Sequence, residues 1–288
     1  MTGLALWLWL AVASDAHLKG VAAYEKRDYN QAVQLLRQSV QSEPGGSAEF
    51  QESALLLGQS FYFTKAFADA VPWLEKASGY SAHSAEVLYM LGTAYTQTGH
   101  AEKSTAIFAK LFGVKEESAA GHLIAGQMLL RFEMEGPAEQ ELLRALALDP
   151  KIPEAHFMLG EIALYRGEID AGRKEFEREI VLNPNSSASY YRLGDAFTRR
   201  EEWTEAITAL QRSIWLNPNF SGPYILLGKA YQKTGELANA EGTLRRAIQL
   251  DPQNYSAHYI LGQTLIQLQR IPEGKQMLER SQQLRKPK

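Results

Sequence analysis

The sequence contains no cysteine. This absence excludes disulfide bonds, thiolate catalysis, cysteine-ligated zinc and a lipid-modified cysteine. It leaves the redox compartment open, because a helical fold without disulfides is compatible with both oxidising and reducing environments.

The sequence also lacks a hydrophobic run long enough to cross a membrane. The apolar stretch at residues 4–13 is ten residues long, whereas a spanning helix needs about 20. Its length suits the hydrophobic part of a signal peptide, and Ala11, Val12 and Ala13 resemble a cleavage site. No Lys or Arg precedes it, so the alternative is an apolar lead-in helix. We expect residues 1–13 to be one of these, which predicts a periplasmic or secreted protein in the first case and a cytoplasmic one in the second.

Motifs for catalysis and metal binding are absent too. The six histidines show no HExxH spacing, and no glycine-rich loop of the GxxxxGK(S/T) or GxGxxG type occurs. Basic and aromatic residues form no common stripe of the kind that binds nucleic acid. The sequence therefore predicts a protein that is not an enzyme, needs no cofactor or metal, and has no nucleic-acid partner and no stable membrane span.

Charge of one sign is not in large excess. The formal net charge is −3, from 30 Lys and Arg against 33 Asp and Glu. Residues 1–150 carry 11 basic and 17 acidic residues, whereas residues 151–288 carry 19 and 16. This asymmetry reflects either solvated surfaces or a groove whose polarity orients a charged partner.

A short pattern that returns every 34 residues is the main feature of the sequence. It reads LGTAY at residues 91–95 and LGKAY at residues 227–231. Its glycine falls at Gly58, Gly92, Gly126, Gly160, Gly194, Gly228 and Gly262. A fixed period kept through seven copies predicts a repeat protein.

Numbering each repeat so that this glycine is residue 8 reveals the pattern of the remaining positions. Position 20 is small in every copy: Ala32, Ala70, Ser104, Ala138, Gly172, Ala206, Ala240, Gly274. Position 24 is bulky: Leu36, Leu74, Phe108, Leu142, Phe176, Leu210, Leu244, Leu278. Position 32 is proline in five copies: Pro44, Pro150, Pro184, Pro218, Pro252.

This pattern predicts a pair of antiparallel helices in each repeat. Positions 4, 7, 8 and 11 share one face of a first helix, and positions 20, 24 and 27 share one face of a second. Glycine at 8 and a small residue at 20 let the two helices approach closely. Proline at 32 ends the second helix, and Ser or Asn in 183–187 caps the next one. One pair cannot bury its own apolar face, so the pairs must stack.

The pattern resembles the tetratricopeptide repeat family, whose signature combines Leu-Gly at 7–8, an aromatic residue at 11, Ala at 20 and Pro at 32. The segment 190–197, followed by Ala206, Leu210 and Pro218, is a close match. The resemblance implies an all-α, right-handed superhelical solenoid of eight antiparallel helix pairs over residues 14–288. The implied repeats lie near residues 13–44, 51–84, 85–118, 119–152, 153–186, 187–220, 221–254 and 255–288.

Three histidines occupy position 4, where the family places an aromatic residue that packs between helices. They are His122, His156 and His258. We interpret them as core side chains rather than metal ligands.

The resemblance also implies a non-enzymatic scaffold that binds a protein or an extended peptide in a concave groove lined by the first helices. Two alternatives stay open. The chain is a homo-oligomerising structural module, or it is an accessory subunit of an envelope, secretion or glycan-assembly complex. The sequence does not identify the partner.

Positions 5 and 9 provide the candidate groove residues. Position 5 is apolar: Leu55, Tyr89, Leu123, Phe157, Tyr191, Ile225, Tyr259. Position 9 is mostly hydrogen-bonding: Gln59, Thr93, Gln127, Glu161, Asp195, Lys229, Gln263. An apolar row beside polar groups suits an extended peptide. The alternative is that position 5 packs against the neighbouring repeat. For Leu55 and Leu123 the two interpretations are even, and for the four aromatic residues binding is favoured.

Charged residues cluster at the candidate groove positions of repeats 5–7. The acids Glu161 and Asp195 lie near bases at neighbouring positions. We predict a charged binding site formed by Glu161, Arg192, Asp195, Arg199, Lys229 and Lys233.

Overall fold

The structure is a computed structural model that describes residues 15–80 and 85–285. The predicted signal peptide or lead-in helix at residues 1–13 lies outside the described residues. All regular structure in the described ranges is helical, and they contain no strand. The chain divides into two compact units, residues 1–150 and residues 151–288. That residues 14–288 form one continuous solenoid stays a prediction.

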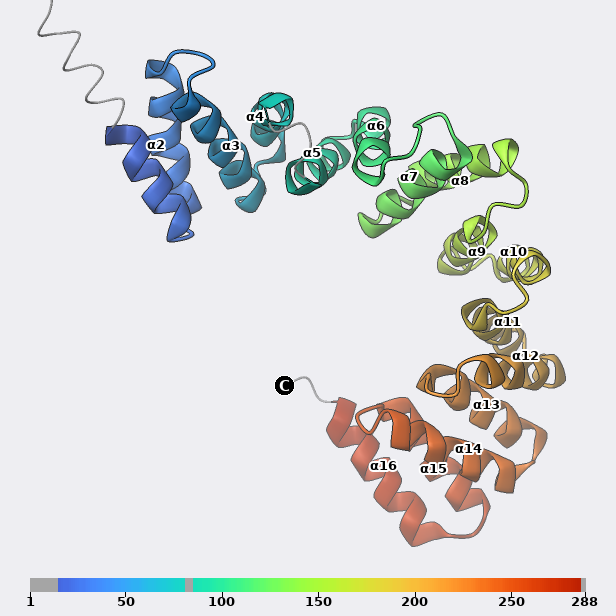
Figure 1. The fold of residues 1–288 in the computed structure, drawn as a ribbon. Coiled ribbons are helices and arrows are strands. Elements are labelled where there is room, and N and C mark those ends of the chain that lie inside the picture. Colours follow the sequence, from blue (N-terminus) through green and yellow to red (C-terminus); the bar gives the residue numbers. More distant parts are fainter. Residues whose placement is uncertain (1–14, 81–84, 286–288) are drawn as a thin grey trace, which may run out of the picture. The chain divides into compact units, whose positions relative to one another are not determined.

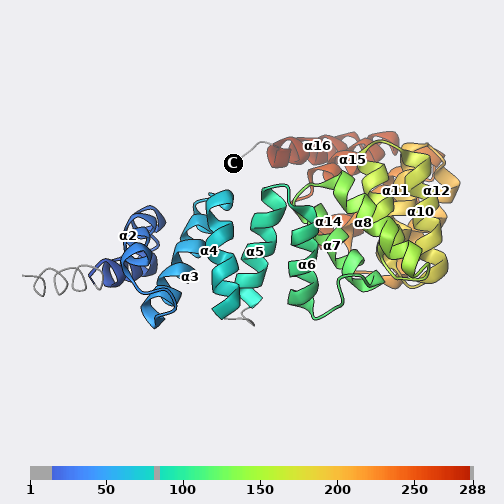
Figure 2. The ribbon, with the colours of Figure 1, turned by 90° about the horizontal axis from the view of Figure 1, so that it is seen from above.

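The first unit is a stack of helix pairs (Figures 1 and 2). A helical segment at residues 15–25 pairs with the first labelled helix. The labelled helices are α2 (Tyr29–Ser42), α3 (Ala48–Phe63), α4 (Phe67–Tyr80), α5 (Ala85–Gln97), α6 (Ala101–Phe112), α7 (Ala119–Arg131) and α8 (Glu135–Leu148).

The second unit repeats the same arrangement four times. Its helices are α9 (Ala155–Tyr165), α10 (Ile169–Leu182), α11 (Ser187–Arg199), α12 (Trp203–Leu216), α13 (Ser221–Thr234), α14 (Leu237–Leu250), α15 (Tyr255–Gln267) and α16 (Ile271–Arg285). Each helix packs on the next one in the sequence. In addition, α13 contacts α11 and α15, the first helices of the two adjacent repeats. The described residues thus contain the eight predicted helix pairs, four in each unit.

Helix ends follow the predicted signals. Helices α2, α8, α10, α12 and α14 each end two residues before a proline, because the residue preceding proline is disfavoured in the helical conformation. Ser186 caps α11 by accepting a hydrogen bond from the Ser189 amide at 3.2 Å. Asn254 caps α15 in the same way through the Ala257 amide.

The turn inside each helix pair contains a feature that the sequence pattern did not predict. Position 15 has a left-handed backbone in every repeat, with φ between 59° and 83°: Arg27, Lys65, Gly99, Glu133, Gly167, Glu201, Gly235, Gln269. Only three of these are glycine, although non-glycine residues pay roughly 1–2 kcal/mol for this conformation. In the sequence, the only indication of this left-handed turn is the three glycines, which are spaced 68 residues apart.

The recurrence of glycine at position 8 is explained by its contact with the side chain at position 24 of the same repeat. A Cβ atom built on Gly160 would lie 2.5 Å from Cε1 of Phe176, and one on Gly194 would lie 2.6 Å from Cγ of Leu210. The glycine therefore makes room for a buried bulky side chain of the second helix. This confirms the predicted close approach of the two helices and identifies the group that fills the space.

Ion pairs join successive repeats in the second unit at the same pair of positions, 21 of one repeat and 16 of the next. Arg173 Nη1 lies 3.3 Å from Glu202 Oε2, which joins repeats 5 and 6. Glu241 Oε1 lies 2.7 Å from Arg270 Nη1, which joins repeats 7 and 8. The second pair has the opposite polarity.

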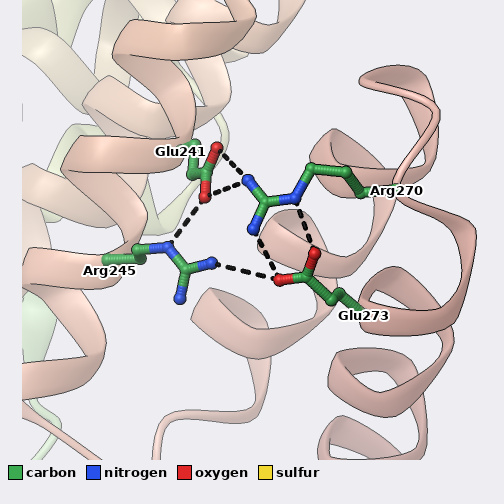
Figure 3. Close-up of polar contacts among 4 residues, drawn as sticks. All are labelled: Glu241, Arg245, Arg270 and Glu273. Atoms are coloured by element: carbon green, nitrogen blue, oxygen red, sulfur yellow. Dashed lines mark hydrogen bonds and ion pairs between the residues drawn. The ribbon is translucent and has the colours of Figure 1, made fainter.

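The pair between repeats 7 and 8 belongs to a closed network of four charges (Figure 3). Arg270 also donates to Glu273, and Arg245 bridges Glu241 at 2.9 Å and Glu273 at 3.8 Å. Burial raises the pKa of Glu241, but the hydrogen bonds from Arg245 and Arg270 outweigh it and leave that pKa below its usual range. The hydrogen bond from Arg270 likewise lowers the pKa of Glu273.

This network makes the last two repeats sensitive to acid. Because both carboxyl pKa values are lower in the folded state, their stabilisation is present above the unfolded value of about 4.5 and disappears as pH falls through the folded values. We expect Arg270→Gln to lower the unfolding temperature at pH 7, and this difference from the wild type to shrink towards pH 3. Thermal unfolding measured across pH 3–7 checks this. A difference that is constant with pH would contradict it.

No helix among the described residues is both long enough and apolar enough to span a bilayer.

Candidate functional site

The candidate site is a hollow between α13 and α15, the first helices of repeats 7 and 8. Its volume is about 650 Å³. Four predicted groove residues line it, namely Lys229, Lys233, Tyr259 and Gln263. The remaining lining residues are Gln232, Tyr255, Ser256, Ile260, Ile266 and Gln267.

Aromatic side chains form one wall of this hollow. Tyr255 and Tyr259 follow each other by one helical turn on α15, and each is 49% exposed. Large half-exposed tyrosines have an apolar ring to cover and a hydroxyl to hydrogen-bond, which makes the residue frequent in binding hot spots. Gln263 donates to the Tyr259 hydroxyl at 3.0 Å and so orients it.

A hydrogen bond beside the hollow links its two helices. Gln232 of α13 donates to Thr264 Oγ1 of α15 at 3.1 Å. Thr264 in turn donates to the Ile260 carbonyl at 2.9 Å. The two helices are therefore linked next to the hollow, while its lining residues Lys233 and Gln267 are exposed.

The opposite wall is basic. Lys229 and Lys233 lie one turn apart on α13, and neither α13 nor α15 contains an acidic residue. The Lys229 ammonium lies 6.0 Å from the centre of the Trp203 ring, at the edge of the range for a cation–π contact. Among the described residues, the lining of this hollow therefore contains two basic residues and no acidic one.

The other predicted charged residues neutralise one another. Glu161 of α9 forms a bidentate pair with Arg192 of α11, with both contacts at 2.7 Å. Arg199 donates twice to Asp195, at 2.9 and 3.1 Å. Burial raises the pKa of Glu161 in spite of Arg192. The predicted charged site of repeats 5–7 thus separates into two internal ion pairs and the lysines of α13.

Three of the position 5 aromatic side chains contact an aromatic residue of their own repeat. The Phe157 ring lies 5.8 Å from that of Phe176, and the Tyr89 ring lies 6.4 Å from that of Phe108. Tyr191 packs edge-on against Phe220 at 4.9 Å, and burial raises its pKa. These rings are partly buried, whereas Tyr259 is the exposed one.

Two predicted position 9 residues of the first unit are buried. Gln59 is 6% exposed and Thr93 is 3% exposed. Gln59 accepts a hydrogen bond from the Tyr24 hydroxyl at 2.9 Å, which ties it to the preceding repeat. In this structure both side chains therefore present little surface to a partner.

The remaining predicted residues are partly buried. Leu55 packs against the core of the first unit. Three others lie on the first helices of their repeats and keep part of their surface in solvent: Leu123, Gln127, Ile225.

A second hollow, of about 360 Å³, lies in the first unit and was not predicted. Its lining is acidic: Glu102, Thr105, Glu116, Glu117, His122, Glu141, Arg144. His122 Nδ1 lies 2.6 Å from Glu141, which also accepts from Arg144 at 2.7 Å. The sequence feature that indicates this pair is a histidine at position 4 together with a glutamate at position 23. The same combination recurs in the next repeat, where His156 Nδ1 lies 2.7 Å from Glu175 Oε2.

These histidines occupy the core position assigned to them, but as polar pairs rather than as isolated rings. His258 instead hydrogen-bonds through Nδ1 with the Asn254 carbonyl at 2.9 Å. Within the described ranges, no group of three or more His, Asp or Glu residues is arranged to hold a metal ion.

Comparison with solved structures finds other helical repeat proteins. A crystal structure of MamA is 24% identical over 55% of this chain and 93% of its own, with a TM-score of 0.51. YrrB, described as a TPR protein with an unusual peptide-binding site, is 21% identical over 62% of this chain and 92% of its own, with a TM-score of 0.55. The Cut9–Hcn1 complex of APC/C matches at 14% identity over 82% of this chain and 52% of that one, with a TM-score of 0.52.

These similarities show the fold alone, and no curated protein sequence matches the chain. Family models described as tetratricopeptide repeat match residues 17–84 and 137–181, 85–118 and 233–283. A model described as TPR repeat matches residues 194–235. Together with the helix pairs and the 34-residue period, they show that the chain belongs to the tetratricopeptide repeat family.

Proposed function

We propose that this chain is a non-enzymatic scaffold that binds an extended segment of a partner protein between the first helices of repeats 7 and 8. The observation that carries the proposal is the hollow between α13 and α15, which combines two half-exposed tyrosines with exposed polar groups. Extended peptides offer alternating side chains and backbone amides, and such a surface can bind both.

Two further features favour this site over the other predicted positions, and a third supports peptide binding by this architecture. The charges of repeats 5 and 6 already pair with each other. Gln59 and Thr93 are buried. YrrB, which shares the fold, is described as having a peptide-binding site, and this provides a precedent for the architecture.

The proposal predicts that the tyrosines of α15 are the anchors. Peptides selected from a random displayed library on the wild-type chain should bind the double variant Tyr255→Ala, Tyr259→Ala at least about tenfold more weakly, because buried tyrosine anchors are typical hot spots. Fluorescence polarisation with the labelled peptides measures the affinity, and circular dichroism checks that the variant is folded.

Tyr165→Ala is the matched control, because this tyrosine is 80% exposed, belongs to the same unit and does not line the hollow. It should bind as the wild type does. Unchanged binding by the double variant would refute the site. Light scattering that shows concentration-dependent association, lost in the double variant, would assign the hollow to a second copy of the chain instead.

A further inference from the structure

The walls of the hollow differ in chemistry in a way that specifies its occupant. One wall, on α13, carries Lys229 and Lys233, and the other, on α15, carries Tyr255, Tyr259 and Ile260. Within the described residues, neither lysine takes part in an ion pair, and no acidic residue lines the hollow. An occupant with negative charge on one side and apolar groups on the other would complement both walls.

The spacing of these side chains matches an extended chain. Lys229 and Lys233 are four residues apart on one helix face, which corresponds to a rise of about 6 Å. Alternate side chains of a β-strand lie roughly 6.7 Å apart on the same side. Two carboxylates at positions i and i+2 of an extended segment therefore reach the two lysines, while the residues between them point to the opposite wall.

The tyrosine wall has the same repeat distance. Tyr255 and Tyr259 are also four residues apart, and both rings are half exposed. The lining of α15 extends from Tyr255 to Gln267, which spans about 18 Å along the helix and accommodates roughly five residues of extended chain. The amides of Gln263 and Gln267 lie on the same lining and are able to pair with backbone groups of that chain.

A nucleic acid fits this surface less well. A single strand needs a track of positive charges for successive phosphates together with stacking platforms. The hollow offers two lysines on one helix, and its other polar lining groups are glutamines, a serine and tyrosine hydroxyls. Two charges one helical turn apart suit a short acidic segment better than a polyphosphate backbone.

We infer that the hollow between α13 and α15 selects an extended protein segment in which acidic residues alternate with apolar ones. The acidic side chains face Lys229 and Lys233, and the apolar side chains face Tyr255, Tyr259 and Ile260. This inference rests on the proposed function and adds the chemistry of the partner to it.

The test uses four fluorescein-labelled probes on the full chain. They are an octapeptide of alternating Glu and Leu, its Gln–Leu counterpart, its Lys–Leu counterpart, and a twelve-nucleotide oligouridine. We expect the Glu–Leu peptide to bind at least about tenfold more tightly than the Gln–Leu peptide, with affinity that falls as salt rises. Equal binding of the Glu–Leu and Gln–Leu peptides, or binding of oligouridine instead of the Glu–Leu peptide, would overturn the inference.

Charge reversal provides the decisive comparison. In Lys229→Glu, Lys233→Glu the Glu–Leu peptide should lose at least about tenfold in affinity, and the Lys–Leu peptide should gain. The control Lys174→Glu, Lys275→Glu makes the same change in net charge outside the hollow and should leave both affinities unchanged. If the reversed variant unfolds, Lys229→Met, Lys233→Met tests the same loss.

Different outcomes would refute the proposed function and the acidic specificity. Selected peptides that depend on Tyr255 and Tyr259 but show no preference for acidic residues would leave the proposed function intact and refute the acidic specificity. If no peptide of any charge binds in a way that depends on these tyrosines, both are refuted.

Discussion

Replacement of Phe176 by alanine is expected to lower the free energy of unfolding by about 3–5 kcal/mol. Phe176 has no exposed surface, lies directly over Gly160 and contacts the Phe157 ring. Its truncation leaves a cavity between α9 and α10 that the surrounding helices fill only in part. Urea unfolding followed by circular dichroism measures the loss.

Hydrogen exchange shows which helices lose stability in the Phe176→Ala variant. Stability in helical repeats is close to a sum of local terms, so the amides of α9 and α10 should lose more protection than those of α15 and α16. Phe176→Leu is the control, because leucine occupies this position in repeats 6 and 7, and it should cost less than about 1.5 kcal/mol. An alanine variant as stable as the leucine variant would show that the ring does not fill this space.

The second large effect is expected from alanine at Gly228, which should destabilise the chain by about 1–3 kcal/mol. A Cβ atom there would lie 2.5 Å from Cγ of Leu244. Leu244 is fully buried and cannot move aside without displacing its own neighbours. Denaturant unfolding of the single variant measures the cost.

The same substitution at Gly242 should have the opposite sign. Gly242 lies in the interior of α14, and a Cβ atom there would meet nothing within 4 Å. Alanine then only removes the helix penalty of glycine, so we expect a gain of about 0.5–1 kcal/mol. A loss at both positions would mean that helix–helix approach at Gly228 is not the cause.

The fold was predictable because each of its determinants recurs at a fixed position. Proline at 32 and glycine at 8 act through backbone geometry and local sterics, and both effects are visible in a single sequence. The left-handed residue at position 15 was harder to predict. Five of its eight occurrences, such as Lys65 and Glu201, are residues that normally avoid this conformation, and the tight turn forces them into it.

The candidate site was only partly predictable, because accessibility depends on neighbouring repeats. Lys229 and Tyr259 were selected by position alone, and both line the hollow. The same positions in the first unit hold Gln59 and Leu55, which aromatic and aliphatic neighbours cover. The pairing of Glu161 with Arg192 in the next repeat depends on a contact between residues 31 apart, which composition and period do not reveal.

The opposite polarity of the two inter-repeat ion pairs has a consequence for how this chain can be rearranged. Arg173, at position 21 of repeat 5, pairs with an acidic residue at position 16 of the next repeat, whereas Glu241 of repeat 7 pairs with a basic residue there. A chain in which repeat 8 directly followed repeat 5 would place Arg270 against Arg173, and two like charges at this joint would repel each other. These two joints of the second unit therefore prefer different neighbours, although the repeats share the same helix-pair architecture.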